Sequence, residues 1–272
     1  MATNQKVLKV LMSTLAATGA FALAAPASAV APNWAGTADY KAAPTAALDE
    51  DTVGPFDRYD FGVGVVLLEP TSATTYDGFY QSFVTNHQLG GLIAAAAGLN
   101  SNYELTAVAS FSETLTTPST FTLNPGGTFK LYFDTIPDRD FNTDAGFNDD
   151  VSILEGEIVQ GSGALFTDST GASVGFSTLD VKISSYDKNV FEPDTIQSGS
   201  SIFTLSINNP ADAGFLNGIS SVQGHSFDSG AGDLLAAADG NLVLQVPEPE
   251  TYAMMIAGLG LVGAAAARRK RS

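Results

Sequence analysis

From Phe56 onward, most of the sequence consists of short stretches in which apolar side chains alternate with polar or small ones. Residues 103–111 (YELTAVASF) place an apolar side chain at every second position, and residues 61–68 follow a similar pattern. This period of two is typical of a β-strand with one buried face, because successive side chains of a strand point to opposite sides. Turn-forming Gly, Asn, Asp and Pro residues separate the stretches. The sequence therefore predicts a mainly β domain, an antiparallel β-sandwich-like ectodomain over residues 56–245.

The clearest hairpin that the sequence predicts joins residues 121–123 to residues 129–133. The connection is Asn124-Pro125-Gly126-Gly127, a combination that favours a tight turn. Further strands are expected at 151–160, 164–167, 179–185, 201–208 and 242–246.

One stretch departs from the strand pattern and predicts a short helix. Its large side chains recur at spacings of three, four, seven and eight residues, and they are Tyr76, Phe79, Tyr80, Phe83 and Val84. Such a stripe covers one face of a helix, so we expect this helix to pack on the sheet. An alternative is that these aromatic rings, together with Trp34, form a platform on which a sugar stacks.

Segment 30–55 is rich in Ala, Pro, Thr and acidic residues, and it is expected to be a linker before the domain. We expect Trp34, the one tryptophan of the chain, to dock on the domain.

The charge of the chain excludes nucleic acid as a partner. Residues 30–249 keep 6 of the 12 basic residues and 28 of the 29 acidic ones, which gives this region a net charge of −22. Binding to nucleic acid requires basic side chains that neutralise phosphates. Cations, or an anionic matrix bridged by cations, fit this surface better.

The composition also argues against an enzyme. The chain has no cysteine, which excludes disulfides and thiolate metal sites, and its two histidines are His87 and His225. A hydrolase remains an alternative, with Glu155 and Glu157 about 6–7 Å apart on one face of a strand as the two carboxylates that a glycosidase needs. An outward-facing strand explains this pair better, and we expect no catalytic residues.

An acidic loop over residues 134–150 is the candidate metal site. Calcium prefers six to eight oxygen ligands, and alternating Asp and Asn side chains supply them. The fit to an EF-hand loop is partial, because Thr143 stands where the sharp turn needs glycine. A solvated acidic loop is the alternative. The candidate calcium ligands are Asp138, Asp140, Asn142, Asp144 and Asp149.

Both ends of the chain have the features of transport signals. Residues 1–29 combine Lys6 and Lys9 with an apolar stretch and with Ala27-Ser28-Ala29, which predicts a secretory signal cleaved after Ala29 by signal peptidase. At the other end, residues 251–267 form an uncharged run that as a helix would span roughly 25 Å, enough for a short transmembrane helix. The basic cluster Arg268, Arg269, Lys270 and Arg271 follows and is expected to stay cytoplasmic as the membrane stop.

The tail VPEPETYAMMIAGLGLVGAAAARRKRS, residues 246–272, resembles the PEP-CTERM sorting signal. The resemblance implies processing by exosortase, a membrane enzyme of Gram-negative bacteria that make exopolysaccharide, with Pro247, Glu248 and Pro249 as the residues that it reads. The prolines favour extended backbone, which keeps such a segment accessible. The chain would be anchored in the inner membrane for a time and would finally lie at the cell surface or in the extracellular matrix.

A second resemblance concerns residues 106–135 and 153–166, which look like the central region of flocculation-associated PEP-CTERM proteins. It implies a surface or matrix protein that supports flocculation or biofilm formation, with exopolysaccharide or neighbouring cells as partners. The alternative is a carbohydrate-binding module without a structural role.

Overall fold

The computed structural model describes residues 32–167, 173–196, 200–208, 214–246 and residue 259. Within these residues one antiparallel sheet of ten strands forms the core of the fold, and two small sheets accompany it. The prediction of a mainly β, antiparallel domain is confirmed. The strands of the main sheet are β3 (Arg58–Phe61), β4 (Gly64–Pro70), β5 (Thr75–Leu89), β6 (Leu92–Ala94), β7 (Glu104–Thr117), β8 (Thr120–Asp134), β9 (Val151–Thr167), β10 (Ser173–Tyr186), β12 (Ser200–Asn208) and β15 (Leu234–Val243).

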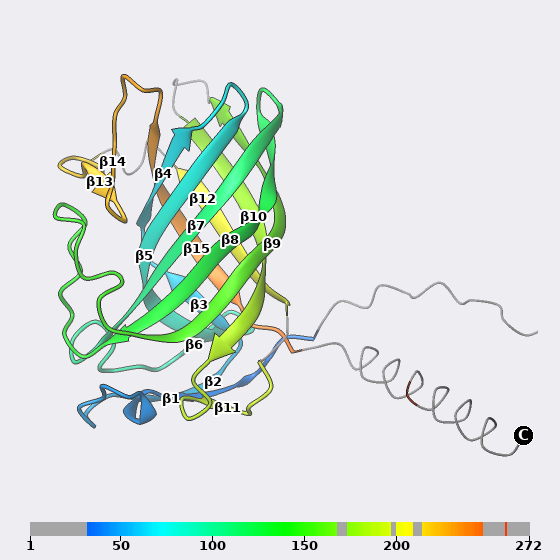
Figure 1. Cartoon of the computed structure of the whole chain (residues 1–272). Coiled ribbons are helices and arrows are strands. Elements are labelled where there is room, and N and C mark those ends of the chain that lie inside the picture. Colours follow the sequence, from blue (N-terminus) through cyan, green and yellow to red (C-terminus); the bar gives the residue numbers. More distant parts are fainter. Residues whose placement is uncertain (1–31, 168–172, 197–199, 209–213, 247–258, 260–272) are drawn as a thin grey trace, which may run out of the picture. The chain divides into compact units, whose positions relative to one another are not determined.

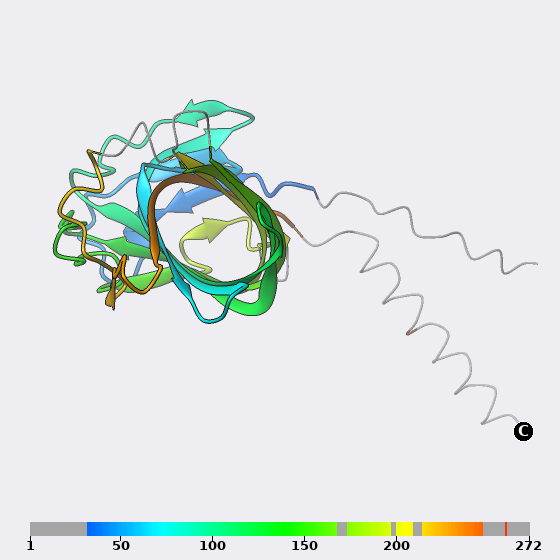
Figure 2. The same ribbon diagram turned by 90° about the horizontal axis from the view of Figure 1, so that it is seen from above.

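The main sheet closes on itself, so it is a barrel rather than the two stacked sheets of a sandwich (Figures 1 and 2). Strand β15 pairs with β12 on one side and with both β3 and β4 on the other. Strands β3 and β4 share one place in the ring and β6 lies off it, which leaves eight places. Closure gives each of these places a neighbour on both sides, so the ring has no free edge. Alternation along single strands cannot distinguish a barrel from a sandwich, because both bury one face of each strand.

Apolar side chains at alternate positions of the strands point into the barrel and form its core. In β7 the predicted inward face, Leu105, Ala107, Ala109 and Phe111, is buried. Glycines of β9 make room for large neighbours, and a Cβ atom at Gly163 would lie 2.3 Å from the ring of Phe121. Large rings on one strand thus occupy the space left by glycines on the neighbouring strand.

One end of the barrel is closed by the segment that the sequence predicted to be a linker, and that prediction is wrong. Residues 32–56 form β1 (Gly36–Asp39), a 3₁₀ turn η1 (Tyr40–Ala42) and β2 (Thr52–Phe56), and β1 also pairs with β11 (Phe191–Glu192). These elements lie below the barrel in Figure 1. Trp34 docks as expected, with 1% of its surface exposed, and its indole N–H donates to the Pro193 carbonyl over 2.9 Å. The segment is folded against the barrel because its aromatic side chains are buried there, although its polar composition predicted a linker.

The predicted helix over Tyr76–Val84 is also wrong, because these residues lie in strand β5. Tyr80 faces the interior and is fully buried. Phe79 lies on the opposite face, where its ring stacks on His225 with 3.5 Å between centroids. Both faces of the strand are covered, so large side chains occupy consecutive positions and imitate helical spacing.

The predicted hairpin at Asn124–Gly127 is a bulge inside the long strand β8. The registers of β8 with β7 and with β9 both shift here, and Gly126 adopts a positive φ of 104°. The side-chain amide of Asn124 donates to the hydroxyls of Ser112 and Thr114 on the neighbouring strand, both at 3.1 Å. The true reversal between β7 and β8 lies at residues 118–119.

A second apolar cluster covers part of the outer wall. Val65 and Leu67 of β4 point outward and pack against Ile219 and Val222. Val222 belongs to a small hairpin of β13 (Ser221–Val222) and β14 (His225–Ser226), which lies beside β4 in Figure 1. The outward faces of β4 and β5 are therefore buried in this region.

The first and last described parts of the domain lie side by side. The backbone N–H of Trp34 donates to the Leu244 carbonyl over 2.9 Å, and that of Val246 donates to the Pro32 carbonyl over 3.0 Å. The expected tail helix over 251–267 lies, apart from Leu259, outside the described residues. Among the residues that are described, no helix has the length and apolar character needed to span a membrane.

Candidate functional site

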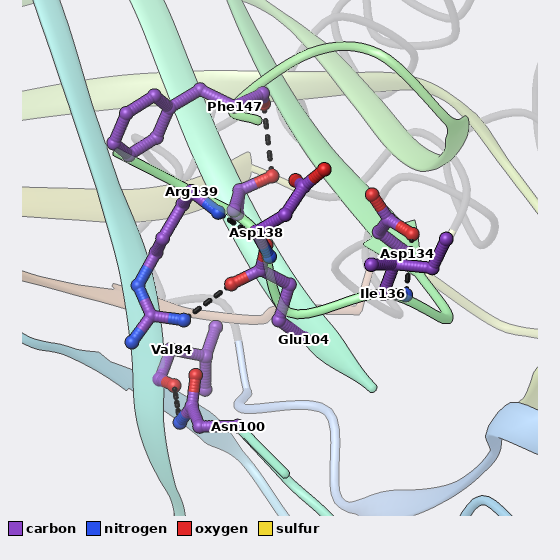
Figure 3. Close-up of polar contacts among 9 residues, drawn as sticks. Val84, Asn100, Glu104, Asp134, Ile136, Asp138, Arg139 and Phe147 are labelled. Atoms are coloured by element: carbon purple, nitrogen blue, oxygen red, sulfur yellow. Dashed lines mark hydrogen bonds and ion pairs between the residues drawn. The ribbon is translucent and has the colours of Figure 1, made fainter. Parts of the chain in front are cut away.

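The acidic loop between β8 and β9 is fastened to the barrel by Glu104, the first residue of β7 (Figure 3). The backbone N–H groups of Asp138 and Arg139 donate to Glu104 Oε1 at 3.0 and 3.1 Å. The Arg139 guanidinium forms an ion pair with Glu104 Oε2, and it also lies 3.6 Å from the centre of the Phe83 ring. Glu104 is fully buried, so these contacts replace the water that its carboxylate gives up on folding.

Glu104 belongs to the group of carboxylates in the described part of the chain that could hold a metal ion. One carboxylate oxygen from each of Glu104, Asp134 and Asp138 lies within 4.8 Å of the other two. Burial raises the pKa of Asp134, and the nearby Asp150 and Asp138 carboxylates add to the effect. The group shares one residue, Asp138, with the predicted calcium ligands.

The other predicted calcium ligands accept backbone hydrogen bonds, from the loop or from the β13–β14 hairpin, or are exposed. Asp140 accepts the N–H of Asn142 over 2.8 Å, and this bond lowers the pKa of Asp140. Asp144 accepts the N–H groups of Gln223 and Gly224 at 2.9 and 2.7 Å. Asn142 and Asp149 are exposed. The structure does not bring these five side chains to one point, and calcium binding stays a prediction.

The pair considered for glycoside hydrolysis lies on the outer wall of β9. Glu155 is partly exposed and forms an ion pair with Lys130 over 3.0 Å, and Glu157 is exposed. This is the outward strand face that the sequence favoured.

The two histidines are in very different surroundings. His225 lies on the outer wall, with its Nδ1 3.3 Å from a Glu69 oxygen. His87 is fully buried at the closed end, where its Nε2 lies 2.6 Å from the Tyr40 hydroxyl. Burial lowers the pKa of His87 to about 3, so this side chain is neutral at ordinary pH.

The aromatic side chains proposed as a sugar platform do not form one surface. Trp34 and Tyr80 are buried in the core. The Phe79 ring is covered by His225. Tyr76 lines an internal cavity. A flat stacking surface for sugars therefore has no support from these four residues.

That internal cavity is the feature that the sequence did not reveal. It has a volume of about 210 Å³, and its lining includes Pro118 and Ser119 of the turn between β7 and β8. This turn lies at the end of the barrel away from β1 and β2 (Figure 1). Glu113 of β7 points into it, with 4% of its surface exposed. Burial raises the pKa of Glu113 to about 7. The available signal was a glutamate at an inward position of an otherwise apolar stripe, between Phe111 and Leu115.

The comparison with protein families concerns the tail. The model of the PEP-CTERM protein-sorting motif matches residues 245–271. The chain carries a PEP-CTERM sorting motif. This tail indicates a protein that is exported, held at the membrane by its tail and processed by exosortase. Comparisons with curated proteins and with solved structures give no match.

The residues assigned to sorting lie outside the described part of the chain. They are Pro247, Glu248, Pro249, Arg268, Arg269, Lys270 and Arg271 in the PEP-CTERM tail, and Ala27 and Ala29 at the expected cleavage site. The last described residue before the Pro-Glu-Pro sequence is Val246, which is hydrogen-bonded to the folded domain.

Proposed function

We propose that the protein is a non-enzymatic component of the cell surface or extracellular matrix that supports flocculation or biofilm formation together with exopolysaccharide. The PEP-CTERM tail is the observation that carries this proposal, because such a tail indicates an exported protein that is held at the membrane and processed. The likeness of residues 106–135 and 153–166 to flocculation-associated proteins adds the specific role.

The charge of the folded domain supports an interaction mediated by cations. Three of the six basic residues in segment 30–249 already form ion pairs with acidic side chains: Lys130, Arg139 and Lys188. Most of the acidic side chains therefore have no basic partner of their own. Divalent cations would bridge such a surface to an anionic polysaccharide.

The experiment is a settling assay of cells that lack this protein. We expect deletion to slow aggregation, and the full-length chain to restore it. A chain that ends at Val246 keeps the folded domain but lacks the tail, so it should be exported without restoring aggregation. Chelation of divalent cations should dissociate aggregates of parent cells, and added calcium should restore them. Normal settling of the deletion strain would contradict the proposal.

Processing of the tail is tested separately by the intact mass of the protein from its host, with and without exosortase. We expect the mature chain to begin at residue 30 in both strains and to lose the apolar tail in the strain that has exosortase. An unprocessed tail in both strains would contradict exosortase processing and would leave the settling assay valid.

A further inference from the structure

The barrel has an apolar cavity at the end that the N-terminal segment does not close. The walls come from the inward faces of strands on every side of the ring, including Phe111, Phe121, Leu165, Leu205 and Ile207. A cavity of about 150 Å³ lined by apolar side chains holds a benzene molecule. The volume of about 210 Å³ in this barrel therefore suits one aromatic ring with a short chain, or an alkyl chain of similar size.

One charged side chain reaches into this apolar space. The strand register places Glu113 directly between Tyr76 of β5 and Leu123 of β8. The Glu113 side chain is buried, with 4% of its surface exposed. Its carboxyl group forms no hydrogen bond or ion pair with any other described residue. Burial of a carboxylate without a partner destabilises the folded protein, because the charge loses its hydration. Another group that pairs with the Glu113 carboxylate would offset this cost.

The other side chains that line the cavity limit the kinds of ligand that it can bind. Among the residues that the structure describes, Tyr76 is the one other titratable group that lines the cavity, and no Lys, Arg or His does so. An anionic ligand would meet Glu113 and the net charge of −22 over residues 30–249. A purely apolar ligand would fill the space and leave the carboxyl unpaired. A ligand with one ammonium group would supply the missing partner and place its apolar body against the walls.

We propose that this cavity is a binding site for a small amine with an apolar body, whose ammonium group pairs with the Glu113 carboxylate. The inference is independent of any role in aggregation, since it concerns the interior of the barrel and not its acidic outer wall.

The test measures binding to the processed protein purified from its host by calorimetry at pH 8, where the Glu113 carboxyl is mostly ionised. The probes are 2-phenylethylamine, 2-phenylethanol and 3-phenylpropionate, which share one aromatic body and differ in the polar group. We expect the amine to bind at least tenfold more tightly than the alcohol, and the carboxylate to bind most weakly. Equal binding of amine and alcohol, or no binding of the amine, would overturn the proposal.

Two substitutions separate the charge from the space. Glu113→Gln should abolish the preference for the amine over the alcohol. Ser177→Leu adds apolar volume at an inward, buried position of the lining and should weaken both ligands. Glu157→Gln on the outer wall of β9 is the matched control and should leave binding unchanged. A Glu113→Gln protein that keeps the preference would overturn the role of this carboxylate.

A measurement on the unmodified protein covers the case in which these variants fold poorly. Tyr76 of β5 faces Glu113, and β8 presents Leu123. The other described residues that line the cavity carry no charge. Because the amine requires the ionised carboxylate, its affinity should rise at least tenfold between pH 5 and pH 8, while that of the alcohol should not rise. A flat pH profile for the amine would contradict the ion pair.

Discussion

The two ends of the barrel are built from the same strands and differ in what fills them. At the closed end Trp34, Tyr40 and Phe56 pack among the ends of the strands and are buried. At the hollow end the inward positions include Leu205, Ser177 and the glycines of β9, and a cavity of about 210 Å³ remains. A barrel of eight strands has an interior that is either filled by side chains or just wide enough for one small ligand. This barrel does both, and the size of the inward side chains decides between the two outcomes.

The largest expected effect comes from opening the closed end. Trp34→Ala removes a buried indole and its hydrogen bond to Pro193, and it should reduce the free energy of unfolding by about 4 kcal/mol. Denaturant unfolding followed by circular dichroism measures the loss. Leu48→Ala in the same segment is the control, because Leu48 is 73% exposed and its loss should change stability by less than about 0.5 kcal/mol. Similar values for both variants would mean that the segment does not plug the barrel.

Glu113 should make the protein less stable as the pH rises from about 4.5 toward 7. Its pKa is about 7 in the folded protein against an ordinary value of 4.5, so the folded state is favoured at low pH and loses stability as the pH rises through 7. Between pH 5 and pH 8 the parent should lose roughly 2 to 3 kcal/mol more than Glu113→Gln. Urea unfolding at a series of pH values gives both curves. Parallel curves would show that Glu113 is hydrated rather than buried.

His87 should make the closed end sensitive to acid, the opposite dependence. Its pKa is about 3 in the folded protein against 6.5, so the stability that it confers is present above pH 6.5 and is lost as the pH falls toward 3. Between pH 7 and pH 5 the parent should lose about 2 kcal/mol more than His87→Phe. The same urea series measures this difference, and a double variant with Glu113→Gln should show both changes independently. An equal acid response in parent and variant would contradict the burial of His87.

Contacts on the outer wall, away from both ends of the barrel, should contribute least to the free energy of unfolding. The Lys130–Glu155 ion pair joins two side chains that are 39% and 38% exposed, so a double-mutant cycle with alanine should give a coupling energy below about 1 kcal/mol. Raising the salt concentration should reduce it further. A larger and salt-independent coupling would mean that this part of the wall is covered by another molecule.

The sequence predicted strands where one face is buried and the other is solvated. Strand β7 satisfies this condition over Leu105–Phe111, and its inward face is as expected. The condition fails in β5, where Phe79 is covered from outside while Tyr80 fills the interior. Residues 124–127 have the composition of a turn, yet the chain uses them as a bulge because the neighbouring strands continue past them. Local patterns do not contain that information.

The candidate sites show the same limit. The acidic loop was visible in the sequence, but the hydrogen bonds that occupy Asp140 and Asp144 depend on the fold of residues 138–146 and on a hairpin about 80 positions away. The cavity around Glu113 was not visible, because it forms where residues as distant as Leu68, Ser177 and Ile207 meet. The sorting tail was predictable, since its recognition depends on a contiguous stretch of chain.

The pairing of Pro32 with Val246 ends the folded domain directly before the Pro-Glu-Pro sequence. The backbone N–H of Val246 is hydrogen-bonded to the Pro32 carbonyl, and the Pro-Glu-Pro sequence starts at the next position, so the folded domain and the sorting motif are contiguous in the chain. The hydrogen bond between Val246 and Pro32 can form only after residue 246 has left the export channel. The contact between the first and last described parts of the domain therefore forms only after nearly the whole chain has been exported.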